Sequence, residues 1–193
     1  MSEHTLLFPH GELSGNEVMT NILEDNRRRL QRAVSELDDE RIYWQPDSQR
    51  NSIGVTVWHM ARLLDVFFTQ LVKGQAAEHE QWFSQGWAER TGYDPRGIGR
   101  SGWGSVNGYT MKEVAQIPHL PGGLLLQYLD QVYDRVRAYI RDTSMKELAR
   151  AAPGFDGQYT HYQVLSMVLL DNVRHLGEIY LLKALNDHLN SWG

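Results

Sequence analysis

The stretch VLSMVLLDNVRHLGEIYLL, residues 164–182, decides how this chain folds. Its apolar residues recur at steps of three and four, which places them along one face of an α-helix. Asp171 and His175 fall in the same row, one helical turn apart. Burying a carboxylate or an imidazole without a partner costs several kcal/mol, which is comparable to the net stability of a whole domain. The stretch therefore predicts an inward-facing helix in which these two polar side chains have partners.

Three other segments show helical periodicity, and capping boxes such as Ser14-x-x-Glu17 mark several helix starts. The expected long helices cover residues 14–37, 53–73, 121–140 and 160–188. The second is apolar almost all round, so we expect it to be buried on most of its circumference. Its exposed side should consist of Arg62, Asp65 and Thr69.

The fold class follows from these elements. No segment alternates with a period of two over a convincing length, and there is no internal repeat. Shorter helical turns are expected after Thr110 and Ser144, where further capping boxes occur. Four long amphipathic helices bury their apolar faces most economically as a bundle. The sequence thus predicts an all-α four-helix bundle that forms one domain over residues 1–193.

The connection between the second and third helices, residues 74–120, is too long for a tight helical hairpin. It is rich in glycine and aromatic residues, so it either walls a pocket or packs as an aromatic cover under a long crossover. Trp103 and Tyr109 are the candidates for the pocket wall. The glycine-rich run 97–108 lacks the strand and the Gly-Lys-Ser/Thr ending of a phosphate-binding loop. We expect it to be a flexible loop.

Composition excludes several classes of function. The formal net charge is −5, so no basic surface is expected to attract nucleic acid. The chain has no cysteine, which rules out thiolate nucleophiles, cysteine zinc sites and disulfides, and fits a reducing compartment. Residues 1–8 lack the basic start and apolar run of a signal peptide, and no stretch is long enough to span a membrane. We expect a cytoplasmic protein.

Asp171 and His175 are spaced so that both can bind one metal ion, and a third ligand must then come from another helix. His59 is the candidate, at the edge of the apolar face of the second helix. Two imidazoles and one carboxylate leave a coordination position open, which is typical of catalytic sites. Such ligands suit zinc, nickel, iron or manganese. The alternative is a buried Asp–His hydrogen bond without a metal.

Three stretches resemble the DinB/YfiT-like superfamily of metal-dependent helical bundles. They are WQP at 44–46, followed by NSIG at 51–54 and WHMA at 58–61; DNVRHLGEI at 171–179; and the short helix, loop and Tyr-Thr start within 148–165. The resemblance implies that His59 is the first metal histidine and that the final helix supplies two more ligands. Many members have a histidine where this chain has Asp171, although related mycothiol-using enzymes have an acid there. Glu178 occupies the place of a frequent glutamine, and it is either a partner of His175 or an exposed acid.

The resemblance also implies a function: one divalent ion, zinc or nickel with iron or manganese as alternatives, activates a low-molecular-weight thiol for transfer to an electrophile. A hydrolase that uses metal-activated water needs the same three ligands, and a non-catalytic ligand-binding bundle is the third possibility. No catalytic acid or base is identified. We expect a small-molecule substrate, no nucleic-acid or membrane partner, and a homodimer. The other six histidines are expected to be structural or on the surface: His4, His10, His79, His119, His161 and His188.

Overall fold

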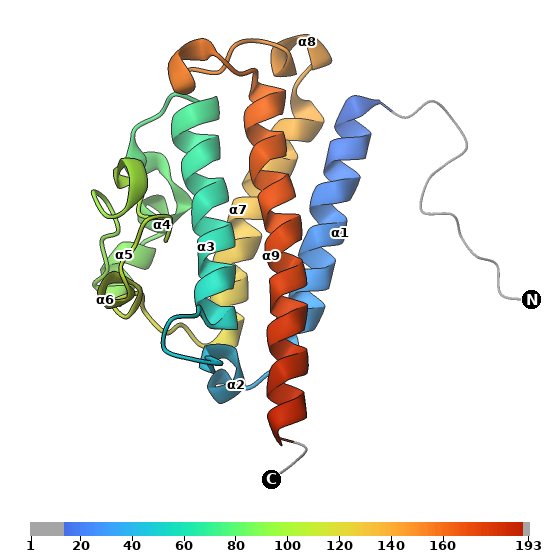
Figure 1. The fold of residues 1–193 in the computed structure, drawn as a ribbon. Helices are drawn as coiled ribbons and strands as arrows, with labels where there is room; N and C mark the ends of the chain where they lie inside the picture. The colour runs from blue at the N-terminus through green and yellow to red at the C-terminus, as the bar shows by residue number, and fades with distance from the viewer. Residues whose placement is uncertain (1–13, 191–193) are drawn as a thin grey trace, which may run out of the picture.

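A computed structural model of the chain describes residues 14–190, with side chains up to residue 188. Four long helices lie side by side in it (Figure 1): α1 (Gly15–Ser35), α3 (Ile53–Val66), α7 (Gly122–Asp142) and α9 (His161–Asn190). α1 packs on α7, α7 on α3, α3 on α9 and α9 on α1, so each helix has two neighbours and the core lies between them. The predicted all-α bundle is confirmed.

The local signals in the sequence explain where these helices begin. Ser14 and Glu17 form the predicted capping box, in which each side chain accepts a hydrogen bond from the other residue's main-chain N–H. Ser52 caps α3 by accepting a hydrogen bond from the main-chain N–H of Val55 (3.3 Å). Pro121 lies one residue before α7 rather than inside its first turn.

The second predicted helix changes its winding before it ends. It is α-helical to Val66 and then continues as the π-helix η1 (Phe67–Val72). The remaining elements are short: α2 (Asp39–Tyr43), η2 (Ala77–His79), α4 (Gln81–Ser84), α5 (Trp87–Thr91), η3 (Arg100–Gly102), α6 (Met111–Val114), α8 (Met145–Leu148) and η4 (Phe155–Gly157). The turns expected after residues 110 and 144 are therefore confirmed as α6 and α8.

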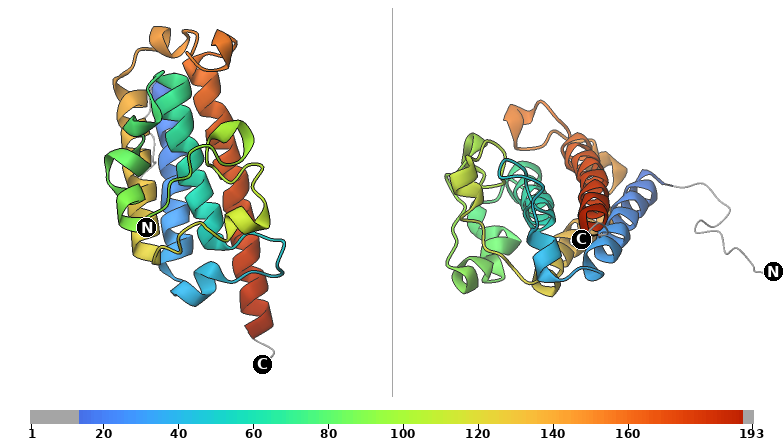
Figure 2. Two further views of the ribbon diagram at one scale, coloured as in Figure 1. Left: turned by 90° about the vertical axis from the view of Figure 1, so that its left-hand side faces the viewer. Right: turned by 60° about the horizontal axis from the view of Figure 1, so that its bottom comes forward.

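The expected exposed side of the second helix is wrong, because Arg62, Asp65 and Thr69 are all buried. The crossover 74–120 runs along this side of α3 (Figures 1 and 2) and supplies partners for the charges. Arg62 Nη1 lies 2.6 Å from Glu80 Oε2. Asp65 accepts hydrogen bonds from the main-chain N–H groups of Gln81 (2.8 Å) and Trp82 (3.0 Å). These polar residues hold the crossover instead of facing water.

The first half of the crossover is an aromatic core. Trp82 and Trp87 are fully buried, and Trp82 contacts the ring of Trp58 edge-on, with ring centroids 5.6 Å apart. The indole N–H of Trp82 donates to the carbonyl oxygen of Tyr93 (3.1 Å). The second half, from about residue 96, lies over the polar residues of α3 and α9 that are described next. Both interpretations of the long connection therefore apply, each to one half of it.

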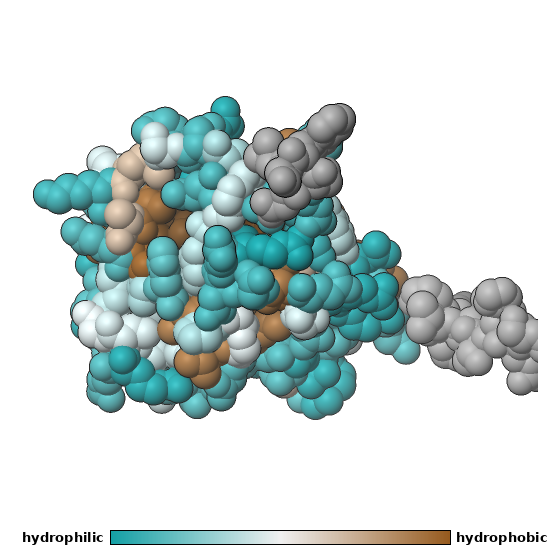
Figure 3. Space-filling view, turned by 90° about the horizontal axis from the view of Figure 1, so that it is seen from below, coloured by the Kyte–Doolittle hydropathy of each residue, from teal (hydrophilic) through white to brown (hydrophobic). Residues whose placement is uncertain are grey.

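The surface of the bundle is mixed. Seen from the end at which α2 lies, hydrophilic residues cover most of the molecule and hydrophobic ones form separate patches (Figure 3). Among the described residues, no helix combines the length and the apolar composition needed to cross a membrane.

Candidate metal centre

The structure brings His59, Asp171 and His175 together. His59 comes from the middle of α3 and the other two from the middle of α9, and these helices pack against each other. Asp171 Oδ2 lies 3.5 Å from Nε2 of His59 and 3.5 Å from Nε2 of His175. One ligand atom from each residue lies within 4.8 Å of the others, and within residues 14–188 no second group of this kind occurs. Two distant parts of the chain thus present three converging ligand atoms.

The two distances from Asp171 fit ligands of one ion. If each atom is about 2.1 Å from a common centre, two atoms 3.5 Å apart subtend about 113° there, close to a tetrahedral angle. A direct N–H···O hydrogen bond would be shorter, with a heavy-atom distance near 2.9 Å. His59 is buried, whereas the side chains of Asp171 and His175 are 31% and 26% exposed. The group is therefore anchored in the core on one side and open on the other.

The far nitrogen of each imidazole is held by an acceptor. His59 Nδ1–H donates to the main-chain carbonyl oxygen of Ser105, and His175 Nδ1–H donates to Glu178 Oε2 (2.8 Å). A carbonyl oxygen can only accept, so Nδ1 of His59 carries a proton, and Nε2 is the ring nitrogen that faces Asp171. This pattern, in which Nδ1 is bonded and Nε2 is free, orients metal-binding histidines in many proteins.

The charges at the site reinforce one another. Interaction with the imidazole of His175, and then with that of His59, holds the pKa of Asp171 well below its usual range. Interaction with Asp171, and then the hydrogen bond to Glu178, raises the pKa of His175 to about 9. In the metal-free protein at neutral pH, a proton on His175 therefore occupies the place between the two carboxylates. A divalent cation would take the place of this proton and bring two positive charges to the three ligand atoms.

Comparison with known proteins places the chain in a family. A sequence model described as the DinB superfamily matches residues 22–179. The chain belongs to the DinB superfamily. Among solved structures, it is similar to a conserved protein from Enterococcus faecalis, with a TM-score of 0.75 and 19% identity over 90% of this chain and 98% of that one. This likeness supports the fold alone. A search of curated proteins finds no match.

A pocket of about 450 Å³ opens beside Asp171 in this DinB-superfamily protein. Trp103, expected at the pocket wall, is one of its lining residues. Tyr109 is not: its hydroxyl lies 3.3 Å from that of Tyr93, within the crossover. The predicted pair of pocket residues is therefore separated, and of the two only the tryptophan lines the space next to Asp171.

The glycine-rich run 97–108, expected to be a flexible loop, forms a compact turn. Main-chain hydrogen bonds close it from Arg100 N to Asn107 O (2.7 Å) and from Gly104 N to Ile98 O (3.0 Å). Gly104 has a φ of +61°, and a Cβ there would lie 2.2 Å from the carbonyl oxygen of Pro95. Arg62 adds a hydrogen bond from Nη2 to the carbonyl of Trp103 (3.2 Å). These contacts position the main-chain carbonyl of Ser105, which accepts the hydrogen bond from His59.

The remaining described histidines lie outside this group, as expected. His161 shares a hydrogen bond with the hydroxyl of Tyr139 (2.6 Å), and His119 stacks on the ring of Tyr43. His79 is exposed, as is His188 in the last turn of α9. His4 and His10 lie outside the described residues.

Removing the carboxylate that holds His175 should weaken metal binding. We expect Glu178→Ala to lower zinc affinity by about 10- to 100-fold, because His175 loses the acceptor that fixes its ring and its protonated nitrogen. Glu178→Gln keeps an acceptor, so its zinc affinity should lie between those of wild type and Glu178→Ala. Competition with a chromophoric chelator measures the effect, and Glu89→Ala, at an exposed acid on α5, is the control. Equal affinities for wild type and Glu178→Ala would contradict this role.

Proposed function

We propose that this DinB-superfamily protein binds one divalent transition-metal ion through His59, Asp171 and His175, and that it is an enzyme that transfers a low-molecular-weight thiol to an electrophile. The convergence of two Nε2 atoms on Asp171 Oδ2, with both Nδ1 atoms held from behind, is the observation that carries the proposal. Two nitrogen ligands and one oxygen ligand, without sulfur, suit zinc or nickel.

The contribution of each part can be stated from its surroundings. A cation at this place lowers the pKa of a thiol or a water molecule that binds to it. Asp171 supplies the negative charge that keeps the ion in place, while Ser105 and Glu178 keep the imidazoles oriented. With no cysteine among its 193 residues, the chain cannot supply a reactive sulfur itself. The thiol must be a small molecule that enters through the exposed side of the site.

An assay with two substrate panels tests this function. Zinc- or nickel-loaded protein is incubated with glutathione, bacillithiol or mycothiol plus 1-chloro-2,4-dinitrobenzene, and separately with nitrophenyl esters and anilides. We expect thiol-dependent turnover that is lost in His175→Ala. Ester or amide cleavage without a thiol would instead identify a hydrolase. No turnover and no stoichiometric metal would identify a ligand-binding bundle without catalysis.

Metal binding should release a proton. Because the pKa of His175 is about 9, most of the metal-free protein carries this proton at pH 7, and an ion must displace it from Nε2. Zinc affinity should therefore rise by about tenfold per pH unit from pH 7 toward pH 9 and then level off. Titration calorimetry in two buffers with different ionisation enthalpies measures the released proton. A release near zero at pH 7 would contradict the displacement.

The stability of the metal-free protein should depend on pH in the opposite direction. The raised pKa of His175 means that its stabilising contribution is fully present below about pH 6.5 and is lost as the pH rises through 9. Bound metal replaces the proton, so zinc-loaded protein should not lose this contribution. Urea unfolding at several pH values, with and without zinc, compares the two.

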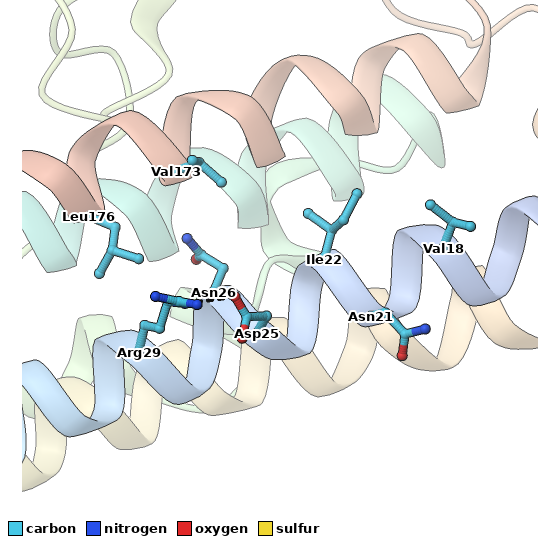
Figure 4. A pocket seen from close by; sticks show the side chains of 8 residues that line it. All are labelled: Val18, Asn21, Ile22, Asp25, Asn26, Arg29, Val173 and Leu176. Atoms are coloured by element: carbon cyan, nitrogen blue, oxygen red, sulfur yellow. Dashed lines mark hydrogen bonds and ion pairs between the residues drawn. The ribbon is translucent and has the colours of Figure 1, made fainter. Parts of the chain in front are cut away.

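We also propose that the protein forms a homodimer through the face shared by α1 and α9. A hollow of about 600 Å³ lies there (Figure 4), and none of the three metal ligands is among the residues that line it. Val18 and Ile22 of α1 face it together with Val173 of α9, and each is between 44% and 47% exposed. Such an apolar face on two adjacent helices suits a two-fold interface with a second copy. Light scattering of Ile22→Glu should show a monomer, whereas Leu124→Glu, at an exposed site on α7, should not change the mass.

A further inference from the structure

The pocket beside Asp171 is built for a particular kind of molecule. Its volume of about 450 Å³ is that of a small-molecule site. Three aromatic rings form one corner of it: Phe67 from η1, Trp103 from the crossover and Phe155 from η4. Their centroids lie 5.0 Å (Phe67–Trp103), 6.0 Å (Phe67–Phe155) and 6.2 Å (Trp103–Phe155) apart. The pocket therefore offers a flat or apolar body a wall of aromatic carbon.

Two charged side chains line the pocket, and they differ in whether they already have partners within the protein. Asp171 is engaged by the two imidazoles at 3.5 Å. Arg100, which is exposed, has neither an ion pair nor a side-chain hydrogen bond within the described part of the chain. Arg96, four residues earlier, pairs instead with Asp94 and Glu78. Arg100 is thus a guanidinium at the pocket that remains available for an anion, with the fork of donors that matches a carboxylate or phosphate.

The backbone around the pocket is strained. The described non-glycine residues with positive φ are Ser101 (56°), Val106 (72°), Phe155 (53°) and Asp156 (53°). Ser101 and Phe155 line the pocket, Asp156 follows Phe155 in η4, and Val106 follows the residue whose carbonyl holds His59. Such conformations cost about 1–3 kcal/mol each and persist where the surrounding structure imposes them, often at ligand sites. The strain is confined to the two segments that shape this pocket.

We propose that the pocket binds the electrophilic substrate, and that this substrate is an organic anion with an aromatic or otherwise flat apolar body. The body lies against Trp103 and Phe155, the anionic group pairs with Arg100, and the other end lies beside Asp171. Calling this molecule a substrate rests on the proposed function. The binding of such an anion can be tested without catalysis.

Three matched probes separate the contributions of body and charge. We would measure the binding of 2-naphthoate, 2-naphthalenemethanol and 2-naphthylmethylammonium by titration calorimetry, in metal-free and zinc-loaded protein. Naphthoate should bind about three- to tenfold more tightly than the alcohol, since an exposed charge-assisted pair contributes modestly. The ammonium compound should bind most weakly. This order is expected in both forms of the protein.

Variants assign the charge preference to one residue. Arg100→Gln should remove the preference for naphthoate over the alcohol, and Lys112→Gln, at an exposed lysine outside the pocket lining, should keep it. Trp103→Leu should weaken both ligands by about tenfold, because it removes the aromatic wall. The main-chain carbonyl of residue 103 is retained in this variant and still accepts the hydrogen bond from Arg62.

Three results would overturn the proposal: no binding of any probe, equal binding of carboxylate and alcohol, or a preference that survives in Arg100→Gln. A preference seen only with zinc and unchanged by Arg100→Gln would mean that the carboxylate binds the ion. Failure of the metal proposal is a separate outcome. In that case the protein holds no stoichiometric zinc, while metal-free protein still prefers naphthoate.

Discussion

Replacing His175 by alanine should lower zinc affinity by about a hundredfold or more. The site offers three protein ligands, and the variant removes one of them together with the link between Asp171 and Glu178. Structural zinc sites gain about 3 kcal/mol for each ligand, which corresponds to a factor of roughly one hundred. Chelator competition gives the dissociation constant, and elemental analysis of protein purified without a histidine tag gives the stoichiometry.

Two further variants make this test specific. Asp171→Asn keeps the size of the side chain but removes its charge, so it should also weaken zinc binding strongly. His79→Ala removes an exposed histidine outside the three-residue group and should leave zinc affinity unchanged. If His175→Ala bound zinc as tightly as wild type, the three side chains would form a hydrogen-bonded cluster and not a metal centre.

Replacing Arg62 by methionine should destabilise the fold by about 3–5 kcal/mol. Arg62 is fully buried, and its guanidinium faces Glu80 Oε2 at 2.6 Å and Asp65 Oδ2 at 3.9 Å. Without it, two carboxylates stay in the interior with no buried cation between them, and removing one partner of a buried ion pair has a cost of this size. Urea unfolding measures the loss. Arg28→Met, at an exposed arginine of α1, should change stability by less than about 0.5 kcal/mol.

The destabilisation caused by Arg62→Met should depend on pH and on the presence of Glu80. Burial already raises the pKa of Asp65 and of Glu80, and loss of Arg62 would raise both further. These carboxylates take up protons as the pH falls, so the destabilisation should be largest at neutral pH and smaller near pH 5. Arg62→Met combined with Glu80→Leu should recover part of the loss, because an apolar pair can replace a buried ion pair. A double variant no more stable than Arg62→Met would contradict the importance of this ion pair.

The fold and the three converging side chains could be predicted from the sequence because both depend on periodicity. The apolar row of residues 164–182 had to face the core, and Asp171 and His175 lay within that row. His59 occupies the middle of the other strongly apolar helix, and two such helices are expected to be neighbours in a bundle. Capping residues then fixed the helix starts to within about one residue.

The errors arose where polar residues do not face water. Arg62, Asp65 and Thr69 follow the pattern of a solvated helical face, yet the crossover covers them. Periodicity cannot distinguish water from a buried acid such as Glu80 that comes from a distant loop.

The hydrogen bond between His59 and Ser105 was missed for another reason. Its acceptor is a main-chain carbonyl, which every residue carries, so the sequence contains no signal for it.

That carbonyl has a consequence for how this protein can vary. Because the peptide backbone provides the acceptor, other small amino acids that fit the buried position 105 would serve as well as serine, provided that the chain keeps its path. Inserting or deleting one residue between Trp103 and Val106 would swing the carbonyl away from the imidazole, even if every side chain were retained. We therefore expect random mutagenesis to find position 105, which is buried, tolerant of small residues, whereas changes in loop length there should abolish zinc binding.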